Sequence, residues 1–390
     1  MSNAGERLKT IRKRRQMTQR GLSDASGVSL TVIRDLEQGN QVGARLETWR
    51  RLAVTLRVST TSLAGSGNEE GPVPGAKERF TELCAALSAP PVKADAWDEP
   101  PTVRGVEAAL ADVMPHRRKD DYEKLAIMLP PIVREADGLE GLDGRRVRAH
   151  VLHLTGWLLT QSRLFEAAED ALNRSLKESP DLTHAAASVS SLCWLHMRTG
   201  NLDAARNLAI KWADDTEPRI TKATPEELCA WGGMLVRVST SAVRDGDGTQ
   251  AKDAMRFASS AATALGREVS PHADLLRTFG PTTVLLKCAE NASVLDQPDT
   301  VLRLAPTVPK AGVRPTTNNW HRHLLDVSYA HAKKGQHAEA IDKMLKIRKI
   351  SAQWLPHQRF ARDVLAEVVK GRRTLTDDMR DLADLVRLPL

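Results

Sequence analysis

Hydrophobic positions in residues 1–65 recur at the three- and four-residue spacing of short amphipathic helices. The apolar positions are Leu8 and Ile11, then Leu22 and Ala25, then Val32, Ile33 and Leu36, and finally Leu46, Trp49, Leu52, Ala53 and Leu56. Thr18 and Ser29 stand where N-caps of the second and third helices are expected, and Gly27 and Gly39 stand where these helices should end. The pattern predicts a compact helical module.

The pattern changes after this module. The run from Gly65 to Gly75 is rich in Gly and Pro and predicts a linker, a short helix is expected at Phe80 to Leu87, and a Pro-rich stretch follows from Ala89 to Pro101. From about residue 103 the chain lacks the alternating runs of β-strands, and helical spacing dominates. We therefore expect an all-α protein divided into residues 1–65, 66–102 and 103–390.

Residues 149–180 resemble a tetratricopeptide repeat. Gly156 and Ala168 occupy the small positions of two paired helices, Leu172 is the bulky position, and Pro180 ends the unit. Three further units show similar spacing: Leu192, Cys193, Gly200, Leu202, Ala205 and Ala209; Leu235, Val238, Ser239, Ala242, Gly246, Ala251, Met255 and Ala258; and Leu324, Ser328, Gly335, Ala340, Met344 and Ile347. The register is poor between residues 264 and 315. A tetratricopeptide-like α-solenoid is expected, with an unrelated helical bundle as the alternative.

The net charge of +7 is confined to the first module. Residues 1–65 contain twelve Lys and Arg against five Asp and Glu, and the rest of the chain is balanced. A basic module beside a neutral body suits a phosphate backbone as partner, although a merely solvated basic end would have the same composition.

The first module resembles the helix-turn-helix of XRE/Cro–repressor-type regulators. The resemblance rests on Thr18, Gln19, Leu22, Gly27, Val28, Ser29, Ile33, Leu36, Glu37 and Gly39, followed by Leu46, Trp49, Ala53, Leu56 and Val58. It implies that the helix after Ser29 enters the DNA major groove. The exposed positions of that helix are expected to read bases, and other polar residues to contact phosphates. The implied base-reading positions are Leu30, Thr31, Arg34 and Asp35, and the implied phosphate contacts are Gln19, Arg14, Arg15, Arg20 and Asn40.

The repeat register also places aromatic and cationic residues on the inner face of the expected solenoid. These candidates for effector binding are Trp157, Trp194, Tyr329, Arg198, Arg244, Lys333, His150 and His153. Aromatic rings beside cations suit an extended peptide with acidic groups or a free carboxylate, whereas the alternative reading makes the tryptophans part of the core.

A helix-turn-helix followed by such repeats is similar to the peptide-sensing regulators of Gram-positive bacteria (the Rap/NprR/PlcR/PrgX group), which act in quorum sensing, and to actinobacterial relatives. The resemblance implies a homodimeric cytoplasmic transcription factor that binds an inverted-repeat DNA operator and takes a peptide, small-molecule or protein effector. An antitoxin or adaptor whose repeats bind a protein is the alternative.

Catalytic and metal-binding motifs are not expected. The sequence contains no GxxxxGK[ST], HExxH or GxSxG, its four cysteines form no CxxC pair, and no run is apolar enough to span a membrane. His321 and His323 alternate like ligands, but we expect surface histidines there. No enzyme activity, metal or cofactor is predicted.

Overall fold

The computed structural model describes residues 4–39, 44, 46–64, 72–90, 97, 99–308, 317–370, 372 and 374–390. Asn40 and most of the predicted linker lie outside these residues. The predicted all-α class is confirmed: within the described residues the only β-pairing is a single antiparallel bridge between Val269 and Phe279. None of the described helices is both long and apolar enough to cross a bilayer.

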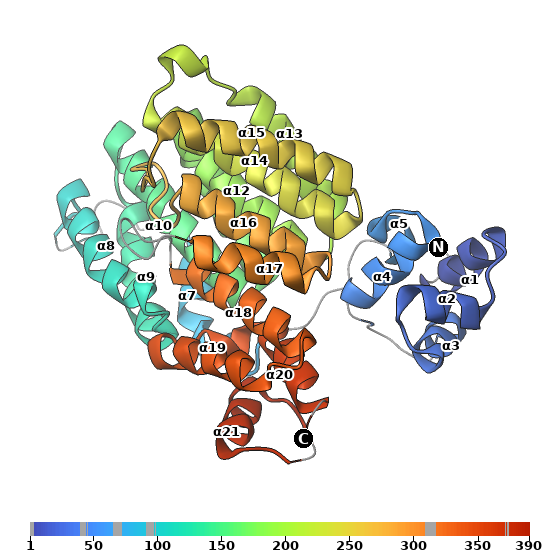
Figure 1. Cartoon of the computed structure of the whole chain (residues 1–390). Coiled ribbons are helices and arrows are strands. Elements are labelled where there is room, and N and C mark those ends of the chain that lie inside the picture. Colours follow the sequence, from blue (N-terminus) through green and yellow to red (C-terminus); the bar gives the residue numbers. More distant parts are fainter. Residues whose placement is uncertain are drawn as a thin grey trace.

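Residues 4–64 form a head of five short helices (Figure 1). They are α1 (Ala4–Arg14), α2 (Gln19–Ser26), α3 (Leu30–Gln38), α4 (Leu46–Leu56) and α5 (Thr60–Ala64). The predicted caps are confirmed: the Thr18 and Ser29 hydroxyls accept hydrogen bonds from the first turns of α2 and α3, and Gly27 and Gly39 end these helices at positive φ. The core of the head is Leu8, Leu22, Val28, Ile33, Leu36, Trp49, Leu52, Ala53, Leu56 and Leu63.

The short helix predicted at Phe80 to Leu87 is present but belongs to the body of the protein. It forms α7 (Thr81–Ser88), after α6 (Ala76–Arg79). Phe80 and Leu83 are fully buried in the same hydrophobic cluster as helix α9 (Tyr122–Asp137). The apolar side chains in this segment therefore anchor it to the body.

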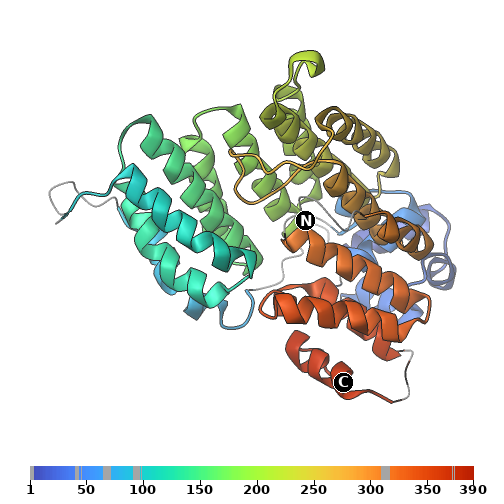
Figure 2. The ribbon, with the colours of Figure 1, turned by 60° about the vertical axis from the view of Figure 1, so that its left-hand side comes forward.

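The body, residues 72–390, is an arc of helical hairpins (Figure 2). The arc begins with α8 (Val103–Arg118) and α9. The next pairs are α10 (Gly141–Gln161) with α11 (Phe165–Glu178), α12 (Leu182–Arg198) with α13 (Leu202–Asp215), α14 (Pro225–Asp245) with α15 (Gly248–Leu265), α16 (Pro281–Val294) with α17 (Pro298–Leu304), and α18 (Thr317–Lys333) with α19 (His337–Ile350). The 3-10 helices η2 (Ile220–Lys222), η3 (Ala305–Thr307) and η4 (Leu355–His357) lie between helices, and α20 (Arg359–Lys370) and α21 (Asp377–Val386) end the body.

The hairpins share one packing register. The Ser239 hydroxyl of α14 donates to the carbonyl of Ala251 on α15, and Ser328 of α18 donates to Ala340 of α19, both at 2.7 Å. Gly156 holds the equivalent place in α10, where an added Cβ would lie 3.1 Å from the Ala168 carbonyl oxygen. A small residue is needed here because the two helices approach to backbone contact.

The arc is closed by contacts between its two ends. The Tyr122 amide at the start of α9 donates to Gln353 Oε1 at 3.0 Å, and the Tyr122 ring meets His357 edge to face at 4.8 Å between centroids. Gln358 and Gln161 are hydrogen-bonded at 3.2 Å. Repeat arrays usually contact only their neighbours. These contacts close the arc into a ring.

Substitution of Gly156 tests the shared register. In Gly156→Ala the new methyl would lie 2.5 Å from Leu172 Cγ, which requires the α10–α11 hairpin to open. We expect a loss of about 2 kcal/mol in the free energy of unfolding, as for other overpacked cores, measured by urea denaturation. Gly233→Ala is the matched control, because a Cβ at Gly233 meets nothing within 4 Å. Equal stability of the two variants would contradict the close approach.

Candidate functional site

The third helix of the head presents a polar face. Ile33 and Leu36 are buried, which leaves Thr31 and Arg34 exposed on the opposite side of α3. Burial on one side of a nine-residue helix fixes which side meets a partner. The neighbouring helices of the head therefore hold α3 with Thr31 and Arg34 facing solvent.

A buried ion pair holds α3 to α1 and α2. Arg12 Nε donates to Glu37 Oε1 at 2.6 Å and Arg12 Nη2 to Glu37 Oε2 at 2.8 Å, and Gln19 Nε2 also donates to Oε2 at 2.8 Å. Burial acts to raise the pKa of Glu37, but the hydrogen bonds from Arg12 and Gln19 outweigh it and the pKa falls below its usual range. Glu37 therefore stays ionised and orients the start of α2 relative to α3.

The residues expected to contact DNA lie on the head as follows. Exposed residues are Arg14, Arg20, Thr31 and Arg34, and partly exposed residues are Gln19, Leu30 and Asp35. Arg15 is also exposed, and its Nε donates to the Leu56 carbonyl at 3.0 Å and so caps the end of α4. Arg15 therefore has a structural role in the head in addition to the predicted phosphate contact.

Four of the predicted effector residues converge on one central cavity of about 230 Å³ inside the ring: Trp157, Trp194, Arg198 and Arg244. The cavity is also lined by residues that the repeat register did not single out. These are Arg117, Gln161, Ser191, Met197, Arg237, Thr240, Leu276, Arg277, Lys287, Glu290, Asn318, Asn319, Arg322, Trp354 and Gln358. They come from the inner helices of all parts of the ring.

The tryptophans of the central cavity are already covered by the protein's own cations. The Arg117 guanidinium lies 5.0 Å from the centre of the Trp157 ring, and the Arg198 guanidinium lies 5.5 Å from that of Trp194. Trp157 is 7% exposed, so it is largely core, whereas Trp194 is half-buried. The rings fix the positions of arginines and offer a ligand few free aromatic faces.

Ion pairs surround the central cavity. Glu290 accepts from Arg244 at 2.5 Å and from Lys287 at 2.7 Å, and Arg277 pairs with Asp274 at 2.5 Å. Arg237 lacks a carboxylate partner among the described residues, and its Nε donates to Ser190 Oγ at 2.8 Å. Arg237 lies seven positions before Arg244 on α14, and helical residues seven positions apart lie on the same face. The repeat register that places Arg244 on the inner face therefore also places Arg237 there.

The four remaining effector candidates lie elsewhere. His150 stacks on His184 at 5.3 Å between ring centres, and His153 bonds Ser191 Oγ at 2.9 Å. Both are buried, and burial lowers their pKa values to about 4 and about 3. The structure therefore gives these histidines packing roles instead of the predicted place on the inner face.

Tyr329 and Lys333 lie toward the head. Tyr329 lines an interdomain cleft of about 530 Å³, and Lys333 Nζ lies 5.7 Å from the centre of its ring and 3.6 Å from Asp296 Oδ2. The head side of this cleft is lined by Gly27, Val28, Ser29, Val32, Glu47, Thr48, Arg50 and Arg51, and the body side by Tyr329, Phe360 and neighbouring residues. The cleft thus includes the first turn of α3.

Polar contacts join head and body across this region. Arg51 Nη2 lies 3.3 Å from Asp296 Oδ2, and Thr60 Oγ1 donates to the Arg244 carbonyl at 3.0 Å. Residues shared by the cleft and the central cavity are Met197, Arg198, Arg244, Arg322 and Gln358. Arg244 therefore contacts the head through its backbone and the cavity through its side chain.

The expectation of surface histidines at 321 and 323 is wrong. His321 is fully buried and His323 is 3% exposed, and burial lowers both pKa values to about 4. Across the part of the chain that the structure describes, no cluster of three or more His, Cys, Asp or Glu side chains is arranged to hold a metal ion.

The Arg12–Glu37 pair can be tested through stability and pH. Glu37→Gln leaves Arg12 buried without its counter-charge, and we expect a loss of about 3 kcal/mol in head stability, measured by amide hydrogen exchange in α1 to α3. Because the folded pKa of Glu37 lies below its unfolded value, the ionised pair stabilises the head above the ordinary Glu range and this contribution is lost as pH falls below it. Glu47→Gln is the control: Glu47 pairs with Arg50 and Arg51 at a more exposed site, where about 0.5 kcal/mol is expected. Similar losses in both variants would refute the role of the buried pair.

Comparison with known proteins identifies the head. A helix-turn-helix family matches residues 8–63, which span α1 to α5, and no curated protein matches the chain. In such domains the helix after the turn enters the major groove, and here that helix is α3. Residues 8–63 are a helix-turn-helix DNA-binding domain of the XRE type, carried by a helical body, and the protein is a DNA-binding regulator.

Proposed function

We propose that the protein is a sequence-specific transcriptional regulator whose body binds an effector in the central cavity. The observation that carries this proposal is the convergence of Trp157, Trp194, Arg198 and Arg244 on that cavity, beside a head that matches a DNA-binding family. The hairpins would be tetratricopeptide-like repeats, and the functional division would follow residues 1–65, 66–102 and 103–390. We place the protein in the cytoplasm, together with the DNA that it would bind.

The head would read DNA through α3. Thr31 and Arg34 are exposed on it, and an arginine can donate to both guanine O6 and N7. Arg14 and Arg20 are exposed close to the ends of α1 and α2, where phosphates of the flanking backbone would lie. Gln19 gives one amide hydrogen to Glu37 and keeps a second for a phosphate.

A homodimer would place two heads on an inverted repeat, since two-fold symmetry in the protein requires it in the operator. The effector would act by changing the position of the heads. The first turn of α3 lines the interdomain cleft with Tyr329 and Phe360, so this turn and the body would compete with a DNA duplex for the same space. An effector that favours one arrangement of head and body would then alter DNA affinity.

A second candidate function, an adaptor or antitoxin that binds a protein, has one supporting observation. A groove of about 520 Å³ on α13 to α15 includes Ile210, Leu235 and Phe257, and the Phe257 side chain is 51% exposed. A protein partner would use this groove, because at about 520 Å³ it is larger than the central cavity of about 230 Å³. Co-purification of a stoichiometric protein that is lost in Phe257→Ser would favour this function.

The DNA-binding role predicts distinct effects for two arginines. Arg34→Ala should weaken binding to an operator selected from random-sequence DNA about 10- to 100-fold while affecting unrelated DNA little, because it removes a base contact. Arg20→Ala should weaken both and lower the salt dependence of log K by about 0.9, the share of one phosphate contact. The measurement is fluorescence anisotropy at several salt concentrations. If selection from random-sequence DNA enriches no sequence, sequence-specific recognition is refuted.

Competition between the body and DNA predicts the effect of weakening the head–body contact. Asp296→Asn removes the carboxylate that meets Arg51, and we expect DNA affinity to rise by about two- to fivefold, in keeping with a partly exposed ion pair. Asp299→Asn is the control, because Asp299 pairs with Lys334 within the body. A fall in affinity for Asp296→Asn, or equal effects of both variants, would show that the docked head does not oppose DNA binding.

A further inference from the structure

The strongest unassigned feature is the charge of the cavity walls. The cations that line the central cavity are Arg117, Arg198, Arg237, Arg244, Arg277, Lys287 and Arg322. Four of these cations form ion pairs with Glu290, Asp274 and Asp326: Arg244, Lys287, Arg277 and Arg322. Among the described residues that line the cavity, seven are cationic and only Glu290 is anionic, so positive charge predominates on its walls.

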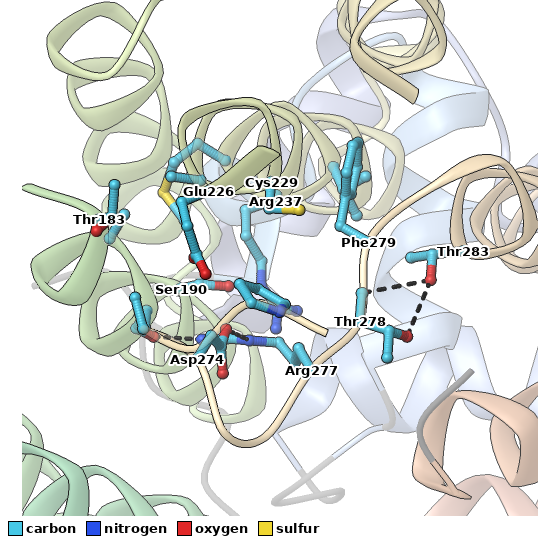
Figure 3. Close-up of a pocket in the computed structure, with 18 of the residues that line it drawn as sticks. Thr183, Ser190, Glu226, Cys229, Arg237, Asp274, Arg277, Thr278, Phe279 and Thr283 are labelled. Carbon is cyan, nitrogen blue, oxygen red and sulfur yellow. Dashed lines mark hydrogen bonds and ion pairs between the residues drawn. The ribbon is translucent and has the colours of Figure 1, made fainter. Parts of the chain in front are cut away.

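The central cavity adjoins a smaller space, an inner chamber of about 70 Å³. Arg237, Arg277, Lys287 and Asn319 line both spaces, and the carboxylates of Glu226 and Asp274 also line the chamber. Figure 3 shows Arg237 reaching from α14 into this chamber, beside Ser190 and above the loop that carries Asp274 and Arg277.

Arg237 differs from its neighbours in its partners. Lys287 has Glu290, and Arg277 has Asp274, but the Arg237 guanidinium bonds only the uncharged Ser190 hydroxyl among the described residues. Burial, and then the positive charge of Arg277, lower the Arg237 pKa to about 10. A guanidinium at this pKa remains charged at neutral pH. Glu290 and Asp274 act on it from a distance, but no carboxylate among the described residues lies within ion-pair distance of this half-buried cation, and an anionic ligand could take that place.

Ring closure limits the size of that ligand. The Tyr122–Gln353 and Gln161–Gln358 contacts close the wall that an open solenoid would leave free for an extended peptide. The aromatic faces of Trp157 and Trp194 are already occupied by Arg117 and Arg198, so charge is the dominant recognition element. Both observations favour a small anion-bearing molecule.

We propose that the junction of the central cavity and the inner chamber binds a doubly charged anionic group, either the phosphate of a small phosphorylated molecule or a dicarboxylate, with Arg237 as its anchor. This proposal deepens the effector site proposed above and rests on it. Arg277, Lys287 and Asn319 would complete the site from the loop, α16 and α18. Glu290 and Asp274 keep the other cations in place and leave Arg237 to the ligand.

The test is isothermal titration of the full-length protein, in chloride buffer at constant ionic strength, with inorganic phosphate, pyrophosphate and succinate. We expect saturable binding of one anion per chain by the phosphate probes or by succinate, and which of them binds assigns the source of the charge. Arg237→Gln should weaken this binding about 10- to 100-fold, the usual value of charge-assisted hydrogen bonds. The matched control is Arg256→Gln, on the outer helix α15 with a side chain 77% exposed, which should bind as the wild type does.

The melting temperature of the Arg237→Gln variant distinguishes a residue that binds the ligand from a residue that stabilises the fold. Without ligand, Arg237→Gln should melt at the same temperature as the wild type or higher, because no ion pair is lost. Binding of all probes no better than chloride, or a destabilised Arg237→Gln variant with unchanged anion affinity, would overturn the proposal. DNA binding by the unliganded protein is measured separately. A protein that does not bind DNA would contradict the proposed function, whereas a protein that binds DNA but no anion would contradict only the anion site.

Discussion

Backbone-close packing between the two helices of three hairpins, α10–α11, α14–α15 and α18–α19, is the constraint on which the body depends. Gly156, Ser239 and Ser328 occupy equivalent positions, and each lies against the backbone of the residue twelve positions later. A larger side chain there would separate the helices and change the curvature that accumulates along the arc. The contacts of Tyr122 with Gln353 and His357 form only when that curvature brings the ends together. The central cavity thus depends on small residues at the helix contacts, two of which, Gly156 and Ser239, directly precede the lining residues Trp157 and Thr240.

The head depends on a different interaction. The Glu37 carboxylate receives three hydrogen bonds from Arg12 and Gln19, and so fixes three helices with one charged group. A buried charge with its partners in place specifies geometry, because any other arrangement leaves it unsatisfied. This specification matters for a DNA reader, since base contacts require the side chains of α3 to be placed relative to phosphate contacts on α2.

The sequence predicted the helices and caps of the head well because these are local: Thr18, Ser29, Gly27 and Gly39 act within a few residues. It also placed Trp157, Trp194, Arg198 and Arg244 on one face, since helical periodicity fixes direction. Ring closure could not be predicted, because it joins residues more than 190 positions apart, such as Gln161 and Gln358. His150 and His153 pack against neighbouring helices and do not line the cavity, for a related reason. On an inner helix packed on nearly every side, periodicity does not distinguish a neighbouring helix from a cavity.

The position of Arg244 connects the two parts of the molecule. Its carbonyl accepts the Thr60 hydroxyl of the head, while its guanidinium is held by Glu290, which also holds Lys287 at the inner chamber. An anion that attracts Lys287 would weaken its pairing with Glu290, and Glu290 would then rely more on Arg244. A shift of that guanidinium would reach the backbone that receives Thr60 through a single residue. Under the proposed function, a change in free energy at this point would alter the balance between a docked and a DNA-bound head.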